Sequence, residues 1–411
     1  MYIVVDKHIP YLHGLLEQIA QVDYLEPKDI TPAAVKAADV LIVRTRTRCD
    51  RALLEGSRVR LILTATIGYD HIDAAYCAEA GISWCNAPGC NADGVCDYVE
   101  SAMRETGTLV SGKTLGIIGV GEVGGRVCRM ATQAGMRVLL CDPPRADKEG
   151  WAPFVSYETI ARMSDVITLH PTLTRTGEIV ENVSERLVVE NASERSIVEN
   201  VSERSIVENA SERSYPSYHL VDEAFLSLTR SDALIINAAR GGIVDEEALL
   251  SSGRRCVIDC WEGEISGERL RASGGRDGVF HRLSNSGERL QTSGSGERLR
   301  AFNGSVVNSA EYYSAAPSCI AEAVHSINTA LVQKAELATP HIAGYTQWGK
   351  YRASDIVLRE LTRFFGLPPI RIPKDEVPPH KTTVFDIRRV SDELKANPEN
   401  FEQQREHYPL R

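Results

Sequence analysis

The segment that most constrains the fold is GIIGVGEVGGRV, which holds a G-x-G-x-x-G pattern at Gly119, Gly121 and Gly124. An apolar run precedes it, an amphipathic stretch follows it, and a second apolar run ends at Asp142. This order predicts a βαβ unit whose glycines let the backbone approach a pyrophosphate at the start of a helix. Asp142 is expected to accept hydrogen bonds from the hydroxyls of an adenosine ribose, which favours NAD over NADP. Arg145 lies nearby in the sequence and leaves NADP open.

Short apolar runs alternate with amphipathic stretches along most of the chain. MYIVVD, ADVLIVRT and VRLILTAT come before the glycine motif, and MRVLLCD, SDVITLH, DALIINAA and RCVIDCW come after it. Such alternation is typical of βα units around a parallel sheet. We therefore predict an α/β protein with two doubly wound parallel-sheet domains, one of Rossmann type and one flavodoxin-like.

Two segments interrupt this alternation. Residues 179–214 hold four copies of a nine-residue unit, and residues from about 265 to 325 are rich in Gly, Ser and Arg. Nine residues make about two and a half turns of an α-helix. Successive apolar pairs would therefore fall on opposite sides of the helix, and no continuous buried face results. Both segments are predicted to be polar surface insertions. Partner docking is the alternative role for the first.

Composition argues against several functional classes. The chain is 25% charged and 43% hydrophobic with a formal net charge of -10, which indicates a globular protein and disfavours nucleic acid or an anionic membrane as partner. No secretion signal opens the sequence and no apolar stretch is long enough to cross a bilayer, so a cytoplasmic location is expected. The ten cysteines form no CxxC pair, and no metal site is expected.

Three polar residues follow later apolar runs, at the strand ends where ligands bind in open α/β sheets. Arg240 ends LIINAAR, Glu264 ends VIDCWEGE and His341 ends ELATPH. Each alone has a plainer interpretation, as a surface charge, a loop carboxylate or a buried histidine. Together they suit hydride transfer on a hydroxy acid. An imidazole can take the hydroxyl proton, a carboxylate can orient that imidazole, and a guanidinium can clamp the substrate carboxylate.

The motifs GIIGVGEVGGRV, INAARGGIVDEEAL, VIDCWEGE and TPHIAGYT, in this order, resemble the D-isomer-specific 2-hydroxyacid dehydrogenase family. The resemblance implies NAD as cofactor and a catalytic set of Arg240, Glu264 and His341. Where the family shows His-Thr-Pro this chain has His-Pro-Thr, so Thr172 takes the place of the expected threonine. The cofactor contacts implied are Gly119, Gly121, Val123, Gly124, Asp142, Thr172, Ala238, Asp259 and Gly344, and the substrate contacts are Arg44, Thr45, Thr66 and Tyr345.

Further segments, among them RTRTR, TATIGYDHID and HIAGYTQWGK, resemble one member of the family that acts on a phosphorylated acid. The reaction implied is NAD-dependent oxidation of 4-phospho-D-erythronate to 2-oxo-3-hydroxy-4-phosphobutanoate, in the synthesis of pyridoxal phosphate. Arg44, Arg46 and Arg48 are candidate partners for the phosphate. The alternatives are a dehydrogenase of another 2-hydroxy acid, such as 3-phosphoglycerate, and a NAD-sensing binding protein with vestigial catalysis.

The resemblance also implies a domain plan. We assign residues 1–95, completed by about 345–366, to a substrate-binding domain, and residues 96–344 to the NAD-binding domain that contains both insertions. Residues 367–411 resemble only the start of a dimerisation domain. The resemblance to the family as a whole implies a homodimer.

Overall fold

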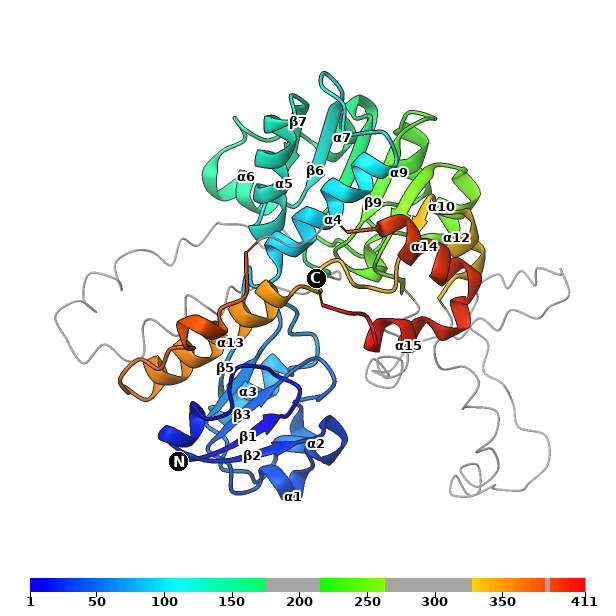
Figure 1. The fold of residues 1–411 in the computed structure, drawn as a ribbon. Helices are drawn as coiled ribbons and strands as arrows, with labels where there is room; N and C mark the ends of the chain where they lie inside the picture. The colour runs from blue at the N-terminus through cyan, green and yellow to red at the C-terminus, as the bar shows by residue number, and fades with distance from the viewer. Residues whose placement is uncertain (175–214, 263–326, 381–384, 411) are drawn as a thin grey trace, which may run out of the picture.

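The computed structural model describes residues 1–174, 215–262, 327–380 and 385–410 (Figure 1). Two parallel sheets lie at opposite ends of the molecule, with long helices between them. The prediction of an α/β fold with two doubly wound parallel sheets is therefore confirmed. The repeat-rich segments that we interpret as insertions, and with them Glu264, lie outside the described residues.

The first sheet has the strand order β2-β1-β3-β4-β5, and all of its neighbouring strands are parallel. Every residue of β3 and β4 is buried, as expected for strands covered on both faces. The short helices of this part begin at Thr31, Asp50 and Asp73, whose side chains each accept a backbone N–H three residues ahead. The strands are β1 (Tyr2–Asp6), β2 (Gln21–Leu25), β3 (Val40–Val43), β4 (Leu61–Thr64) and β5 (Ser83–Cys85), and the helices are α1 (Pro32–Val35), α2 (Arg51–Leu54) and α3 (Ala74–Ala80).

The second sheet has the order β11-β10-β9-β8-β6-β7, again with all neighbours parallel. Its strand order reverses between β6 and β8, so the loop after β6 opens into the crevice where such sheets bind ligands. The strands are β6 (Thr114–Ile118), β7 (Arg137–Cys141), β8 (Val166–Leu169), β9 (Leu234–Asn237), β10 (Arg255–Ile258) and β11 (Leu337–Ala338). The helices are α5 (Glu122–Gln133), α6 (Pro143–Glu149), α7 (Tyr157–Met163), α9 (Glu223–Leu228), α10 (Glu246–Ser252) and α12 (Thr329–Lys334).

Two long helices connect the sheets (Figure 1). α4 (Ala92–Glu105) leaves the first sheet and buries Tyr98, Val99 and Met103 in the core of the second. α13 (Gln347–Phe364) returns the chain, and its apolar face packs with strands β1, β3 and β4 of the first sheet. Neither these nor any other helix in the described ranges is long and apolar enough to cross a membrane.

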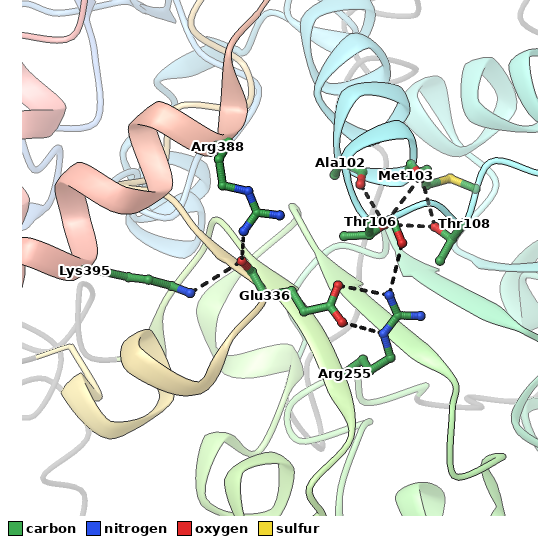
Figure 2. A network of polar contacts seen from close by, with 8 residues as sticks. All are labelled: Ala102, Met103, Thr106, Thr108, Arg255, Glu336, Arg388 and Lys395. Atoms are coloured by element: carbon green, nitrogen blue, oxygen red, sulfur yellow. Dashed lines mark hydrogen bonds and ion pairs between the residues drawn. The ribbon is translucent and has the colours of Figure 1, made fainter.

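The C-terminal segment returns to the second sheet, where α14 (Ile387–Ala396) and α15 (Phe401–Glu406) pack. The Ser391 hydroxyl accepts a hydrogen bond from the N–H of Ala338 in β11 at 2.9 Å. Figure 2 shows a second link, in which Arg388 and Lys395 of α14 donate to the carbonyl of Glu336, and the Glu336 carboxylate in turn binds Arg255 of β10. Short 3₁₀ turns occur at Leu16–Gln18, Pro27–Asp29, Gly241–Ile243, Lys374–Glu376 and Pro398–Asn400.

Candidate active site

The glycine loop after β6 has the geometry that a pyrophosphate requires. Gly119 has a φ of 85°, and a Cβ there would lie 2.5 Å from the nitrogen of Pro171. A Cβ on Gly124 would lie 2.0 Å from the carbonyl oxygen of Gly119, so β6 and α5 can approach only through glycine. A Cβ on Gly121 would meet nothing within 4 Å. The loop thus leaves open space in front of the N-terminus of α5, where backbone N–H groups favour an anion.

Asp142 is fixed beside this loop. Its Oδ2 accepts the N–H of Val120 at 2.8 Å, and its Oδ1 accepts the N–H of Arg145 at 3.2 Å, which caps α6. The Arg145 guanidinium donates to the carbonyl of Val120 at 2.7 Å and to both carboxylate oxygens of Glu149. Because Arg145 already has a carboxylate partner, the surroundings of Asp142 favour ribose hydroxyls over a 2′-phosphate.

The other predicted cofactor contacts lie along the same edge of the second sheet. Val123 is in the first turn of α5, and Ala238 follows β9 directly. Thr172 is exposed in the loop after β8, and its carbonyl accepts a hydrogen bond from the Ser217 hydroxyl at 2.6 Å. Gly344 lies against Asn91 at the start of α4, where a Cβ would be 2.3 Å from the amide nitrogen.

Arg240 reaches from the second sheet to the first. It follows β9, and the Asn237 amide donates to its carbonyl at 2.9 Å. Its guanidinium lies against the loop after β4, where a Cβ on Gly68 would be only 2.3 Å from Nη2. Its Nε is 3.6 Å from a carboxylate oxygen of Asp70. The predicted substrate contact Thr66 belongs to the same loop and donates to the carbonyl of Gly68 at 2.8 Å. Arg240 and Thr66 are thus brought together across the two sheets.

His341 lies on a tight turn after β11, with a φ of 55° that residues other than glycine seldom adopt. The turn is held by Asp259, which follows β10 and is fully buried. Its Oδ1 accepts the Thr339 hydroxyl at 2.7 Å and the N–H of Ile342 at 2.8 Å, while its Oδ2 accepts the N–H of Ala343 at 2.9 Å. Burial raises the pKa of Asp259, and a positive charge on His341 and these hydrogen bonds oppose that rise.

Arg240 and His341 follow β9 and β11, the two neighbours of β10, at the edge where the carboxyl ends of the strands lie. The position of Glu264 relative to them falls outside the described residues.

Two further predicted substrate contacts of the first sheet, Arg44 and Thr45, follow β3. Arg44 makes a two-pronged ion pair with the buried Asp6, with Nε at 2.8 Å and Nη2 at 3.2 Å from the carboxylate oxygens. Thr45 is exposed. Tyr345 is partly buried, and the ammonium of Lys350 lies 5.1 Å from the centre of its ring.

Sequence reasoning did not identify Asp70 or Lys350 as residues of the site. Asp70 lies within the quoted motif TATIGYDHID, but its contact with Arg240 arises only from the tertiary fold. Lys350 lies within the quoted motif HIAGYTQWGK, and its proximity to Tyr345 in the sequence was a usable signal.

Comparison with known proteins agrees with this arrangement. Residues 3–371 match the family model described as the D-isomer specific 2-hydroxyacid dehydrogenase, catalytic domain. An erythronate-4-phosphate dehydrogenase of Bacteroides fragilis is 35% identical over 434 residues, covering 100% of this chain and 97% of that protein. One from Bacteroides thetaiotaomicron is 33% identical over 432 residues, with the same two coverages of 100% and 97%.

Among solved structures, the fold is similar to the D-lactate dehydrogenase of Aquifex aeolicus in complex with NAD and lactic acid. That likeness has a TM-score of 0.52 and 20% identity and covers 89% of this chain and 96% of the other. The family match spans both sheets and every described site residue. The predicted resemblance is therefore confirmed, and the chain is a dehydrogenase that belongs to the D-isomer-specific 2-hydroxyacid dehydrogenase family.

Proposed function

We propose that the protein oxidises 4-phospho-D-erythronate to 2-oxo-3-hydroxy-4-phosphobutanoate, with NAD as the hydride acceptor, in the synthesis of pyridoxal phosphate. One observation of the structure carries the proposal: Arg240, from the sheet with the glycine loop, lies against Gly68 in the loop that holds Thr66. A small acid bound there meets groups from both sheets. The relatives at 35% and 33% identity, both named erythronate-4-phosphate dehydrogenase, support this substrate over other 2-hydroxy acids.

The residues around the glycine loop fit NAD. The open space at Gly121 supports binding of the pyrophosphate at the N-terminus of α5, and Asp142 beside the loop supports binding of the ribose hydroxyls. The ion pair between Arg145 and Glu149 supports NAD over NADP. When bound, the nicotinamide ring accepts a hydride from the carbon that carries the substrate hydroxyl.

The chain's own residues supply binding and proton transfer. Arg240 binds the substrate carboxylate through its planar guanidinium and holds the reacting carbon in place. His341 takes the proton of the hydroxyl as the carbonyl forms. Asp259 fixes the turn that carries His341. Glu264, by the family pattern, stabilises the imidazolium that results.

We also propose that the protein is a homodimer that acts in the cytoplasm. The dimer is inferred from the resemblance to the family as a whole, and light scattering on a sizing column tests it. The location follows from the proposed activity, since phosphorylated acids and NAD are held inside cells.

The test is NADH production by the purified protein with 4-phospho-D-erythronate and, separately, with 3-phosphoglycerate. We expect kcat/KM to be at least about a hundredfold higher with 4-phospho-D-erythronate. Polar groups of a site that hydrogen-bond one substrate are left without partners when a different substrate binds. Equal rates, or a preference for 3-phosphoglycerate, would reject the proposed substrate.

The second arm of the test is His341→Ala. Loss of the base should lower kcat by about a hundredfold to ten-thousandfold, while NAD affinity, measured by fluorescence titration, stays within about twofold. Turnover near the wild-type rate in this variant would show that another group takes the proton.

A further inference from the structure

The first sheet carries a predicted substrate contact, Arg44, and a cation that has no role in the chemistry described so far, Lys350. In the strand order β2-β1-β3-β4-β5, the direction of winding reverses between β1 and β3. Ligands of doubly wound sheets bind in the crevice outside the carboxyl ends of the strands at such a reversal. Asp6 is the last residue of β1, and Arg44 is the first residue after β3. The two residues therefore flank this crevice.

Arg44 is held in a fixed orientation there. The buried Asp6 accepts hydrogen bonds from its Nε and Nη2, which is the geometry of a rigid two-pronged pair. Within the described part of the chain, no group accepts a hydrogen bond from the remaining nitrogen, Nη1. A guanidinium fixed in this way can offer that nitrogen to a ligand at little cost in side-chain entropy.

Lys350 is a second cation near Arg44, on a helix whose Ser354 hydroxyl donates to the carbonyl of Pro10 in the loop after β1 at 2.7 Å. It lies in the first turns of α13, partly buried, with its Nζ 5.1 Å from the centre of the Tyr345 ring. As far as the structure describes the chain, no carboxylate or other acceptor lies within hydrogen-bond distance of that ammonium. Burial lowers the pKa of Lys350, the positive charge of Arg44 lowers it further, and Tyr345 and Asp6 act in the opposite direction.

The balance of charge in this cluster is positive. Arg44 and Lys350 carry two positive charges and Asp6 carries one negative charge, which Arg44 already binds. A partly buried ammonium with no counter-ion is unfavourable, and binding of an anion relieves that cost. The arrangement is that of an anion site.

The other arginines of the loop after β3 make ion pairs with carboxylates at the surface. Arg46 makes ion pairs with Glu402 and Glu406 of α15, each at 3.0 Å. Arg48 makes an ion pair with Asp50 at 2.8 Å. Of the three arginines in RTRTR, only Arg44 pairs with a buried carboxylate, and its charge acts on Lys350.

We propose that Lys350, together with Nη1 of Arg44, binds the phosphate group of the substrate and makes the enzyme specific for a phosphorylated hydroxy acid. The proposal rests on the proposed function for the identity of the acid. Lys350 follows His341 by nine residues, through the turn at Tyr345 and the N-cap at Thr346. One continuous segment would then hold the base at one end of the substrate and the phosphate at the other.

The experiment compares wild type with Lys350→Met, which keeps the length of the side chain and removes its charge. For each we would measure kcat/KM with 4-phospho-D-erythronate and with D-erythronate, which lacks the phosphate. The ratio of the two values should fall by about tenfold to a hundredfold in the variant, the effect of one charge-assisted hydrogen bond. The exposed Lys374→Met is the matched control and should leave the ratio unchanged. An unchanged ratio in Lys350→Met would overturn the proposal.

A binding measurement separates this inference from the proposed function. Titration of inorganic phosphate into the full-length protein in the presence of NAD, followed by calorimetry, needs no turnover. We expect weaker phosphate binding by about tenfold or more in Lys350→Met, and recovery to within about threefold in Lys350→Arg. If wild type oxidises neither acid but shows this pattern, the proposed substrate is wrong and the phosphate site stands. Equal phosphate affinity in wild type and Lys350→Met overturns the site, whatever the activity.

Discussion

At the scale of single residues, Asp259 shows how one buried carboxylate can position the turn of the proposed base, His341. It accepts three hydrogen bonds from residues 339–343 and thereby fixes the turn on which His341 has its positive φ. The Trp261 indole adds a fourth restraint by donating to the carbonyl of Thr339 at 2.9 Å. The geometry of the turn that carries His341 is thus set by β10 and β11, because both the Asp259 carboxylate and the turn follow these strands.

We expect Asp259→Asn to weaken both the fold and catalysis. The amide replaces one oxygen by a donor, so at least one of the three buried donors loses its acceptor and faces another N–H. Unfolding in urea should show a loss of about 1–3 kcal/mol. A turn displaced by about 1 Å should lower kcat about a hundredfold.

The matched control for Asp259→Asn is Asp222→Asn. Asp222 caps α9 by accepting the N–H of Phe225 at 2.8 Å, and asparagine caps a helix equally well. Stability and kcat should therefore stay close to wild type in the control. A similar result for Asp259→Asn would show that the carboxylate does not hold the turn.

At the scale of elements, the loop after β4 joins the predicted substrate contact Thr66 to the core of the first sheet. A chain of hydrogen bonds runs from the His71 ring to the Thr64 hydroxyl at 3.1 Å, from Thr64 to Thr66 at 2.7 Å, and from Thr66 to the carbonyl of Gly68. Gly68 in turn contacts Arg240. The loop that carries Thr66 and contacts Arg240 is therefore tied to the buried ring of His71.

The free energy of unfolding of the protein should depend on pH through His71. Burial lowers the pKa of His71 to about 4, against 6.5 in an unfolded chain, and its Nδ1 has no partner among the described residues. Between these values the unfolded state binds a proton that the folded state excludes, so stability falls as pH drops from 6.5 to 4 and this contribution stays constant below. From pH 7 to pH 5 the loss from this group should be about 2 kcal/mol.

The measurement is urea unfolding of wild type and His71→Gln at both pH values. Wild type should lose about 2 kcal/mol more than the variant over this interval, because glutamine does not titrate. His13→Gln, at a histidine with 65% of its side chain exposed, controls for the general effect of losing an imidazole. Parallel losses in wild type and His71→Gln would mean that His71 can take up a proton in the folded state.

The elements themselves were largely predictable from the sequence, and the contacts between them were not. Runs such as KTLGII and ADVLIVRT form β6 and β3 because continuous apolar runs suit strands that are buried on both faces. The glycine motif was predictable because its spacing is a local pattern: Gly119 has a positive φ, and a Cβ on Gly124 would meet the carbonyl of Gly119. By contrast, Asp70 approaches Arg240 from another sheet, and Arg46 approaches Glu402 from the opposite end of the chain. No local periodicity encodes contacts between residues so far apart in sequence.

At the scale of the whole molecule, the chain passes between its two halves more than once. α4 leads from the first sheet to the second, α13 leads back, and the C-terminal helices return to the second sheet (Figure 1). The ion pairs of Arg46 with Glu402 and Glu406 then link α15 to the loop after β3. These exposed pairs contribute little stability by themselves, about 0–1 kcal/mol each, so the relative placement of the halves depends mainly on the two long helices.

Deletion of residues 179–214 tests whether the nine-residue repeats belong to the enzyme or only interrupt it. The chain on either side is already close together, since the Thr174 hydroxyl donates to the carbonyl of Tyr215 at 2.9 Å and the N–H of Thr174 donates to the Ser217 hydroxyl at 2.8 Å. The residues left after deletion can therefore close a short loop without moving β8 or α9. The free-energy cost of loop closure changes only by about 0.6 kcal/mol for each doubling of loop length. The shortened protein should therefore stay folded, with a free energy of unfolding within about 2 kcal/mol of wild type.

NADH production by the shortened protein should persist or rise, because Thr172 and the glycine loop keep their positions. A folded protein that binds NAD but has lost its turnover would assign the repeats a part in catalysis, and one that keeps its turnover but no longer retains a binding partner would assign them to docking.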